Sequence, residues 1–487
     1  MSTNSSTGDA YIVSLDVGSS SVRTLLFDAG ARQLEGYGAR LPYEPDRTAG
    51  GGVEVNPEKL AGLAIDCFDE LHRQVHNHGL RIAAVASDAF WHSFLGVGEG
   101  GKPTLPILHL LDTRSASEVP RVPDAHARTG CVPHSSYWPA KLLWLSQNRP
   151  SEFAATKRWL SLPEFLFEKL FGRPHVSTSM MSATGLWDQN ANDYDDETLS
   201  ASGVTRAQLP DPAAFDQPAR ALLPEFRAMW PSFEGIPWFP ALGDGACDNL
   251  GSGCITPDRC SLMVGTTGAM RVVVEADRVE IPQGLWCYRV DKKRFILGGA
   301  VSSGGEVFAW MKRTLALPKD LEARLEAAEP GTHGLTLLPF FSGARSPYWR
   351  SDLRAAITGL SFATEPFDIF RAALESVALR FREIDDLVAA RISPPKEVIA
   401  SGGALLKSPA WTQMMADAVG RPLTQCTEPE ATCRGAALWA LEQIGAIDHL
   451  NALPASLGAT FQPREQHRAT YDRLLAGQHL LFDKLYS

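Results

Sequence analysis

The chain has 487 residues and a net charge of −10, from 46 Lys and Arg against 56 Asp and Glu. This length exceeds the roughly 250 to 300 residues at which a single core stops growing, so two or more domains are expected. The chain has no long run of one charge sign, which argues against nucleic acid or a membrane surface as the main partner and favours a small molecule.

The cysteines and the start of the chain indicate the compartment. Eight cysteines are scattered without a C-x-x-C pair, which argues against a disulfide framework or a zinc ribbon and suits a reducing cytosol. The leader "MSTNSSTGDA" has neither a basic nor an apolar segment, and no run of 18 apolar residues follows. We therefore expect a cytoplasmic protein, without support for secretion or membrane spanning.

The first predicted element is a β-hairpin over "YIVSLDVGSSSVRTLLFD", residues 11–28. Its two β-prone runs flank a turn that gathers a carboxylate, a glycine and three hydroxyls: Asp16, Gly18, Ser19, Ser20 and Ser21. One interpretation is a solvated turn, because Asp, Gly and Ser are ordinary turn residues. The other is a phosphate cradle, in which N–H groups and hydroxyls donate to an anion while Asp16 holds a metal through water.

The segment after the hairpin predicts a strand, a helix and two more strands. "LEGYGARL" extends the hairpin, and a helix is expected over 56–75, with Asn56 as N-cap and Pro57 at the first helical position. Apolar residues of this helix recur on one face. The two further strands are expected at 81–87 and 104–111.

"GVGEGGKP", residues 96–103, imitates a nucleotide-binding loop. Gly96, Gly101 and Lys102 have the P-loop spacing, but Pro103 replaces the Ser or Thr that would bind magnesium. We interpret the stretch as a hairpin turn.

His72 and His76 lie four residues apart on the predicted helix, with His78 beyond, and could ligate a metal. No Glu follows the first His as in a zincin, so a solvated helix end is favoured.

Polar residues follow two of the predicted strands, in "SDAFWHS" (87–93) and "LLDTRS" (110–115). Ligands bind at the carboxyl ends of strands in α/β sheets. His92, Asp112 and Arg114 supply donors and acceptors for a polyhydroxylated molecule, and Trp91 can stack on the apolar face of a sugar. Packing of these residues in a core is the equally weighted alternative.

Between about 145 and 241 the pattern is mostly helical and interrupted by proline, with a loop expected at 191–199. We expect an inserted subdomain here.

The stretch "PALGDGACDNLGSG", residues 240–253, is rich in small residues that allow close helix packing. Asp244 lies between two glycines where a helix could begin, a position from which it could serve as a general base. Asp248, one turn later, is the alternative for that role or for a water-mediated metal contact.

The opening pattern returns from Cys260, where "CSLMVGTTGAMRVVVE" is again strand, glycine and hydroxyl turn, strand. A long amphipathic helix over 366–388 and a strand ending in a glycine pair, "EVIASGG", follow. This weak repeat predicts two similar halves whose turns meet at one cleft, with a boundary near Pro240.

With these segments in order, the sequence resembles the FGGY carbohydrate kinases, which share the actin-like ATPase core. The motifs that carry the resemblance are "LDVGSSSVR", "SDAFWHS", "LLDTRS", "GDGACDNLGSG", "VGTTG", "LGGAVSSGG", "LPFFSGARSPYW" and "ASGGALLKSPAWTQMMADAVGRPL". The resemblance implies an α/β fold of two actin-like (ribonuclease H-like) domains facing a central cleft. Residues 11–240 would bind sugar and carry the first phosphate motif, and residues 241–487 would carry the catalytic aspartate and bind nucleotide.

The resemblance also implies ATP and Mg²⁺ as cofactors and assigns roles residue by residue. Asp244 would be the catalytic base, and it would hold magnesium together with Asp16. Substrate would contact Trp91, His92, Asp112, Arg114 and Asp244. Nucleotide phosphates and adenosine would contact Gly18, Ser19, Ser20, Ser21, Arg23, Gly265, Thr266, Thr267, Gly268, Gly305, Gly402 and Gly403.

By resemblance, the expected reaction is phosphorylation of a five- or six-carbon sugar, sugar acid or polyol. "FWHS" with "DTRS" is nearer to the gluconokinase-like members, so gluconate is the first choice and xylulose the alternative. A non-catalytic actin-like sugar sensor is the hypothesis from another class, and retention of Asp16 and Asp244 argues against it. We expect a sugar or sugar acid and ATP as partners, neither nucleic acid nor membrane, and a possible homodimer. Two departures from the family are Trp91, where many members have Met, and "GGALLKSP", one residue longer than the usual loop.

Overall fold

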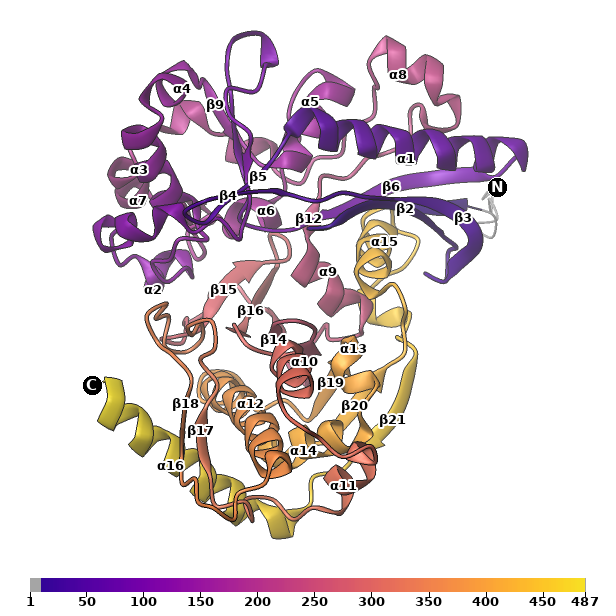
Figure 1. The fold of residues 1–487 in the computed structure, drawn as a ribbon. Helices are drawn as coiled ribbons and strands as arrows, with labels where there is room; N and C mark the ends of the chain where they lie inside the picture. Colours follow the sequence, from indigo (N-terminus) through magenta and orange to yellow (C-terminus); the bar gives the residue numbers. More distant parts are fainter. Residues whose placement is uncertain (1–9, 487) are drawn as a thin grey trace.

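The computed structural model describes residues 10–486, which form two lobes, each built on a β-sheet (Figure 1). The first sheet has the order β12-β6-β1-β2-β3. Its strands are β1 (Ala10–Val17), β2 (Ser21–Phe27), β3 (Gln33–Pro42), β6 (Arg81–Ala89) and β12 (Leu242–Gly243). The β1–β2 and β2–β3 pairs are antiparallel, and β6 is parallel to both β1 and β12. The predicted hairpin, third strand and 81–87 strand are therefore confirmed.

The second sheet repeats this topology. Its order is β15-β16-β14-β13-β19-β20-β21, with β13–β14 and β14–β16 antiparallel and β19 parallel to β13 and to β20. The strands are β13 (Arg259–Val264), β14 (Gly268–Glu275), β15 (Trp286–Arg289), β16 (Arg294–Val301), β19 (Glu397–Ser401), β20 (Leu423–Cys426) and β21 (Leu457–Phe461). The series β20-β19-β13-β14-β16 thus matches β12-β6-β1-β2-β3, which confirms the internal repeat.

Helices cover both sheets because the central strands are apolar on both faces. In the first lobe, α1 (Pro57–Asn77) packs on β2 and β3. The Asn56 side chain accepts a hydrogen bond from Lys59 N and Pro57 opens the helix, as predicted. In the second lobe, the predicted amphipathic helix forms as α12 (Pro366–Ala389), and its buried face packs against β14 and β16. The remaining helices of the second lobe are α10 (Gly305–Thr314), α11 (Leu321–Ala327), α13 (Gly403–Leu406), α14 (Pro409–Val419) and α16 (Arg468–Tyr486).

The histidines of α1 do not form one solvated group. His76 and His78 are exposed as expected, but His72 is buried, stacked on His76 and edge-on to Phe233. Burial lowers the pKa of His72. Within residues 10–486, these histidines are not part of a potential metal cluster.

The strand expected at 104–111 is wrong in extent. Only β8 (Ile107–Leu108) forms, and it pairs with β5 (Gly52–Val55) in a small sheet with β4 (Asp46–Thr48). Pro106 has no N–H to donate to a ladder, and a turn in which Asp112 N donates to His109 O ends the strand. The 96–103 stretch is a turn, as predicted, because Thr104 N donates to Gly96 O.

The inserted subdomain exists but begins earlier than Leu145. A separate apolar core runs from Phe94 to Phe215. The elements of this part of the chain include β7 (Leu95–Val97), β9 (Arg158–Leu160), β10 (Trp187–Asp188), α2 (His126–Thr129), α3 (Trp138–Asn148), α4 (Pro150–Ala155), α5 (Leu162–Phe171) and α6 (Thr178–Ser182), with α8 (Pro224–Met229) following. Helix α5 packs in the core of the first lobe instead. The loop expected at 191–199 is wrong, because β11 (Asp193–Tyr194) and α7 (Asp196–Ala201) form there, with Asp195 capping α7 through Thr198 N.

Two helices from the second half of the chain pack in the first lobe, where Figure 1 shows them between the sheets. They are α9 (Asp244–Gly251) and α15 (Ala431–Gln443), and both contribute to the first core. A Cβ on Gly251 would lie 1.7 Å from Ala431 O, and one on Gly435 would lie 1.9 Å from Cys247 O. Glycines therefore let the two helix backbones meet. The apolar cores do not divide simply at residue 240, since 431–443 returns to the first lobe.

Within the described residues, none of the helices is both long enough and apolar enough to cross a bilayer.

Candidate active site

Three adjacent strands of the first sheet bring carboxylates to one edge. Asp16 in β1 is opposite Asp88 in β6, and Asp88 is opposite Leu242 in β12. Asp244 follows β12 directly, as the first residue of α9. Because these strands are parallel, their carboxyl ends meet at the edge where α/β sheets bind ligands.

The Asp16 and Asp88 carboxylates differ in their partners. Asp16 accepts a hydrogen bond from Arg23 Nε at 2.7 Å, and Arg23 also pairs with Glu430 at 2.5 Å. Asp88 is fully buried, and neither of its oxygens has a hydrogen-bond partner among the described residues. Burial raises the pKa of Asp88 well above its usual range, and the charge of Asp16 raises it further. The sequence analysis missed Asp88, although an acidic residue inside an apolar strand was a signal that it lies at a special site.

The same group provides donors for a cation. Ligand atoms of Asp16, Asp88 and Cys433 all lie within 4.8 Å of one another. The two carboxylates are hard oxygen donors of the kind that Mg²⁺ prefers, whereas the Cys433 thiol is not. The orphaned oxygens of Asp88 therefore fit a cation at this edge of the sheet.

Asp244 is placed for proton transfer. Its Oδ1 accepts a hydrogen bond from Gly245 N at 2.7 Å. Burial raises the pKa of Asp244 to about 6, against the opposing effect of Arg271. A carboxylate with a pKa near neutrality is a suitable general base. Asp248 instead forms an ion pair with Arg271 Nη1 at 2.9 Å. Of the two candidate general bases, the partners therefore favour Asp244.

A cavity of about 150 Å³ lies beside Asp244 and is lined by residues from both halves of the chain. Trp91 forms part of its wall, packed so closely on the glycines around Asp244 that a Cβ on Gly243 would lie 1.7 Å from the indole. The lining residues are Trp91, His92, Leu110, Ser136, Tyr137, Asp244, Gly245, Met263, Thr267, Gly268, Ala269, Arg271, Trp286, Tyr288, Ala300, Arg345 and Trp349. The structure thus brings Trp91, His92 and Asp244 together.

His92 lines the cavity as a neutral ring. Its Nδ1 lies 2.7 Å from Ala183 O and donates to it, which leaves Nε2 as an acceptor. Burial lowers the pKa of His92 to about 3. Its backbone has φ +69°, a left-handed conformation that is rare outside glycine and often found at functional sites.

Two arginines of the cavity were missed by the sequence analysis. Arg271 was signalled by being a lone charge inside the apolar strand β14, whereas Arg345 lies in the quoted "SGARSP" segment. Arg345 Nη2 donates to Val301 O at 3.0 Å. Over residues 10–486, Arg345 has no carboxylate within ion-pair distance, unlike Arg271 with Asp248. Burial lowers the pKa of Arg345.

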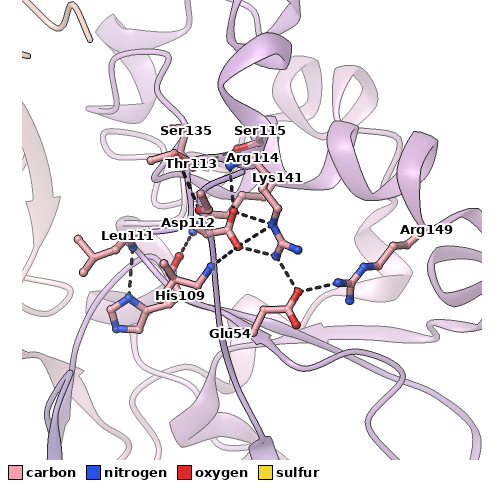
Figure 2. A network of polar contacts seen from close by, with 12 residues as sticks. Glu54, His109, Leu111, Asp112, Thr113, Arg114, Ser115, Ser135, Lys141 and Arg149 are labelled. Carbon is pink, nitrogen blue, oxygen red and sulfur yellow. Dashed lines mark hydrogen bonds and ion pairs between the residues drawn. The ribbon is translucent and has the colours of Figure 1, made fainter. Parts of the chain in front are cut away.

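The structure does not place Asp112 and Arg114 in the cavity lining. Figure 2 shows them in an ion-pair network with Glu54 and Arg149. Arg114 Nη2 contacts Asp112 at 2.5 Å and Glu54 at 2.7 Å, and Glu54 also pairs with Arg149 at 2.6 Å. Asp112 accepts a further bond from Val53 N at 3.1 Å. The sequence could not show this, because the partner Glu54 lies 60 residues before Arg114.

The two hydroxyl-rich turns are both formed at strand ends. In the first, Gly18 N donates to Ser21 O, and Ser19 and Ser20 are exposed. In the second, Gly265 N donates to Thr267 O, with Thr266 and Thr267 exposed. Each turn therefore presents free hydroxyls of the kind that bind phosphate.

A second cavity, of about 450 Å³, lies between α10, α11 and α13. Gly305 and Gly403 line it beside Phe308 and Lys312. Gly402 has φ +90°, and a Cβ there would lie 2.4 Å from Val264 O, so the bend requires glycine. Gly305 and Gly403, two of the predicted nucleotide glycines, thus line one cavity next to the second turn, where Gly305 N donates to Gly265 O.

Comparison with known proteins gives consistent results across the whole chain. Residues 11–251 match the N-terminal domain of the FGGY family of carbohydrate kinases, and residues 260–443 match its C-terminal domain. The chain is 25% identical to a gluconokinase of Bacillus subtilis over 96% of this chain and 94% of the relative. It is 22% identical to a xylulose kinase of Lactococcus lactis over 95% of both.

Solved structures show the same fold. A xylulose kinase from Lactobacillus acidophilus matches with a TM-score of 0.90 at 24% identity, covering 98% of this chain and 99% of that one. A gluconate kinase from the same species matches with a TM-score of 0.89 at 24% identity, covering 98% of both.

Proposed function

The chain belongs to the FGGY family of carbohydrate kinases, and on that basis we propose that it transfers the γ-phosphoryl group of ATP to a hydroxyl of a sugar acid, with gluconate as substrate. The two domain matches establish the carbohydrate kinase, and the substrate is the part that we add.

The observation that carries the choice of substrate is the unpaired Arg345. Its guanidinium reaches the cavity with only a backbone carbonyl as partner. Arg345 is only partly exposed, and a partly buried cation without a counter-ion is costly, so a substrate carboxylate would supply the missing charge through two parallel N–H···O bonds. Xylulose is neutral and could not supply it. The gluconokinase relatives point in the same direction.

The substrate would lie against Trp91 and His92, with its reactive hydroxyl toward Asp244. The Nε2 acceptor of His92 can receive a second substrate hydroxyl and orient the sugar. Asp244 would accept the proton as the hydroxyl oxygen attacks in line with the γ-phosphate. Its raised pKa suits that step near neutral pH.

The phosphoryl donor would lie between the two turns, with its base in the cavity at Gly305 and Gly403. Asp16 would hold Mg²⁺ beside the Asp88 oxygens, and the resemblance to the family adds Asp244 as a further ligand. When bound, Mg²⁺ neutralises charge between the β- and γ-phosphates. Hydroxyls and N–H groups of the turns at 18–21 and 265–268 would position the transferring group.

The test is a panel of sugars and sugar acids in a coupled ADP-release assay with the full-length protein. We expect gluconate to give the highest kcat/KM and glycerol little turnover. Xylulose turned over faster than any sugar acid would replace the proposal by the xylulokinase alternative, and no turnover of any member would reject it altogether. A non-catalytic role has no support from the comparisons, because the matched family consists of kinases.

A further inference from the structure

Lys141 is a fully buried lysine in α3 and lies beside the ion-pair network of Asp112 and Arg114 (Figure 2). Its Nζ donates to His109 O at 2.9 Å and to His92 O at 3.3 Å. In the part of the chain that the structure describes, it has no carboxylate within ion-pair distance. A buried amine is rare and needs a reason, because burial penalises the group unless its bonds are satisfied.

The two carbonyls belong to separate segments of the cavity wall. His92 lines the cavity directly, and Leu110, next to His109, lines it as well. Among residues 10–486, backbone pairing joins the two segments at one bridge, where Leu108 N donates to Phe94 O at 2.9 Å and Phe94 N to Leu108 O at 3.4 Å. Lys141 therefore connects them from behind, at the point where His92 has its left-handed backbone.

The ion-pair network of Figure 2 supports Lys141. Asp112 N donates to His109 O, the same carbonyl that accepts from Lys141. Arg114, which holds Asp112, lies over the ring of Trp144 at 4.6 Å, one turn along α3 from Lys141. The network thus attaches the second segment to the helix that carries the lysine.

We propose that Lys141 is a positioning residue that sets the spacing of the His92 and Leu110 segments and thereby the affinity for the sugar. This inference rests on the proposed function, because it assigns the cavity to the sugar. A left-handed residue outside glycine persists only where its surroundings hold it. Without the Lys141 donors, the His92 carbonyl is left without a partner among the described residues, the His109 carbonyl keeps only Asp112 N, and the wall relaxes.

The chemistry of the amine indicates the conservative variant. Burial lowers the pKa of Lys141 to about 7, and a neutral amine has two N–H donors for its two carbonyl acceptors. Glutamine also carries two N–H groups on one uncharged nitrogen, placed one bond nearer the backbone. Methionine has a similar length and no donor. Lys141→Gln and Lys141→Met therefore separate hydrogen bonding from packing.

The experiment measures kcat and the KM values for sugar and ATP in both variants. Lys157→Met is the control, because Lys157 is exposed and has no side-chain partner among residues 10–486. For Lys141→Met we expect a rise of about tenfold or more in sugar KM, the scale of losing a buried hydrogen bond, with kcat and ATP KM within about threefold. Lys141→Gln should remain within about threefold for sugar KM, and Lys157→Met should equal wild type.

Hydrogen exchange of peptides covering 90–94 and 107–112 is the readout that does not depend on turnover. Lys141→Met should exchange faster there and nowhere else in the first lobe. A folded Lys141→Met with unchanged sugar KM and exchange overturns the proposal, as does equal impairment of the Met and Gln variants, which would indicate packing alone.

Two further cases are a Lys141→Met variant that does not fold and a wild type that phosphorylates no sugar. If Lys141→Met does not fold, Lys141→Gln carries the test: because it keeps both donors, sugar KM should rise by no more than about threefold at constant ATP KM, with exchange at 90–94 and 107–112 near that of wild type. A larger rise in sugar KM, or equal changes in both KM values, overturns the proposal. If wild type phosphorylates no sugar, the proposed function fails. Hydrogen exchange at 90–94 and 107–112 alone then decides whether Lys141 connects the two segments of the cavity wall.

Discussion

Arg114 and Arg345 are two arginines near one cavity with opposite surroundings. Arg114 bonds to Asp112 and Glu54 and lies over Trp144, so its donors are largely used. Arg345 reaches the cavity with one carbonyl partner. Asp248 and Asp244 differ in the same way, since Asp248 has Arg271 at 2.9 Å and Asp244 has only a backbone N–H. The difference teaches that charge alone does not mark a binding residue: a polar group whose bonds are complete supports the site, and one left incomplete faces the ligand.

The largest expected effect comes from replacing Asp244 and Asp248, one at a time, by asparagine. Asp244→Asn should lower kcat by roughly 10² or more, the scale of a positioned base, while sugar and nucleotide affinity change only a few-fold. Asp248→Asn should retain most of kcat, because its carboxylate is engaged with Arg271. Steady-state kinetics with gluconate measure both. An active Asp244→Asn beside an inactive Asp248→Asn would transfer the role of base to Asp248.

Asp16 is an exception to the rule that paired groups support the site, because it is paired with Arg23 and is still proposed to hold magnesium. Asp16→Ala should raise the Mg²⁺ concentration needed for half-maximal rate by about tenfold and slow transfer, since the cation neutralises phosphate charge. Ser20→Ala should do less, as the backbone N–H groups of the turn survive. A magnesium titration checks both, and an unchanged curve for Asp16→Ala would restore the plain hairpin reading of this turn.

Replacing Arg114 should lower stability more than replacing Arg345 does, whereas Arg345 is the one that activity toward gluconate should depend on. Arg114→Met leaves Asp112 and Glu54 without their shared cation and should cost roughly 3–5 kcal/mol of unfolding free energy, as for a broken buried pair. Arg345→Met removes an unpaired charge and should leave the melting temperature unchanged or higher. Arg313→Met is the control, an exposed arginine with no ion pair in residues 10–486. Equal destabilisation by the Arg114 and Arg345 variants would remove the basis of the comparison.

A further expected effect is a pH dependence of stability from Lys141. Burial lowers its pKa from 10.5 to about 7 in the folded protein. Between these values the unfolded chain holds the proton and the folded chain does not, so stability rises with pH and the rise ends above the unfolded value. The groups that influence Lys141, or are influenced by it, are Asp112, Arg114, His92, His109 and His134.

Calorimetric melting of wild type and Lys141→Met from pH 7 to 9.5 measures the contribution of Lys141 to stability as the difference between the two proteins at each pH. The advantage of wild type over the variant should grow as pH rises. A constant difference across the range would mean that Lys141 keeps an ordinary pKa in the folded protein.

Local patterns predicted the parts of the fold that local chemistry decides. The hairpin turn at 18–20, the capped helix after Asn56 and the repeat at 260–275 were read correctly, because glycine, caps and apolar periodicity act over a few residues. Strand β8 was overestimated because its pairing partner, β5, is remote in sequence.

The site was only partly predictable for a related reason. Trp91 and His92 were found because they follow a strand end, and Asp244 because it lies between two glycines at the start of a helix, whereas Asp88 in β6 was not singled out. Asp112 and Arg114 have the residue types of a sugar site, and only the fold shows that Glu54 completes their bonds. Whether a polar group has a partner is a tertiary property, which sequence spacing does not contain.

The most direct test of the central claim is the ratio of kcat/KM for gluconate to that for xylulose, measured in wild type and in Arg345→Met. An unpaired arginine that receives the substrate carboxylate predicts a ratio above one in wild type that falls by about 10² in the variant, mainly through gluconate, since truncating one partner of a buried charge pair costs about 2–5 kcal/mol. A ratio that is the same in both proteins would contradict the account, because Arg345 would then contribute equally to an acidic and a neutral substrate.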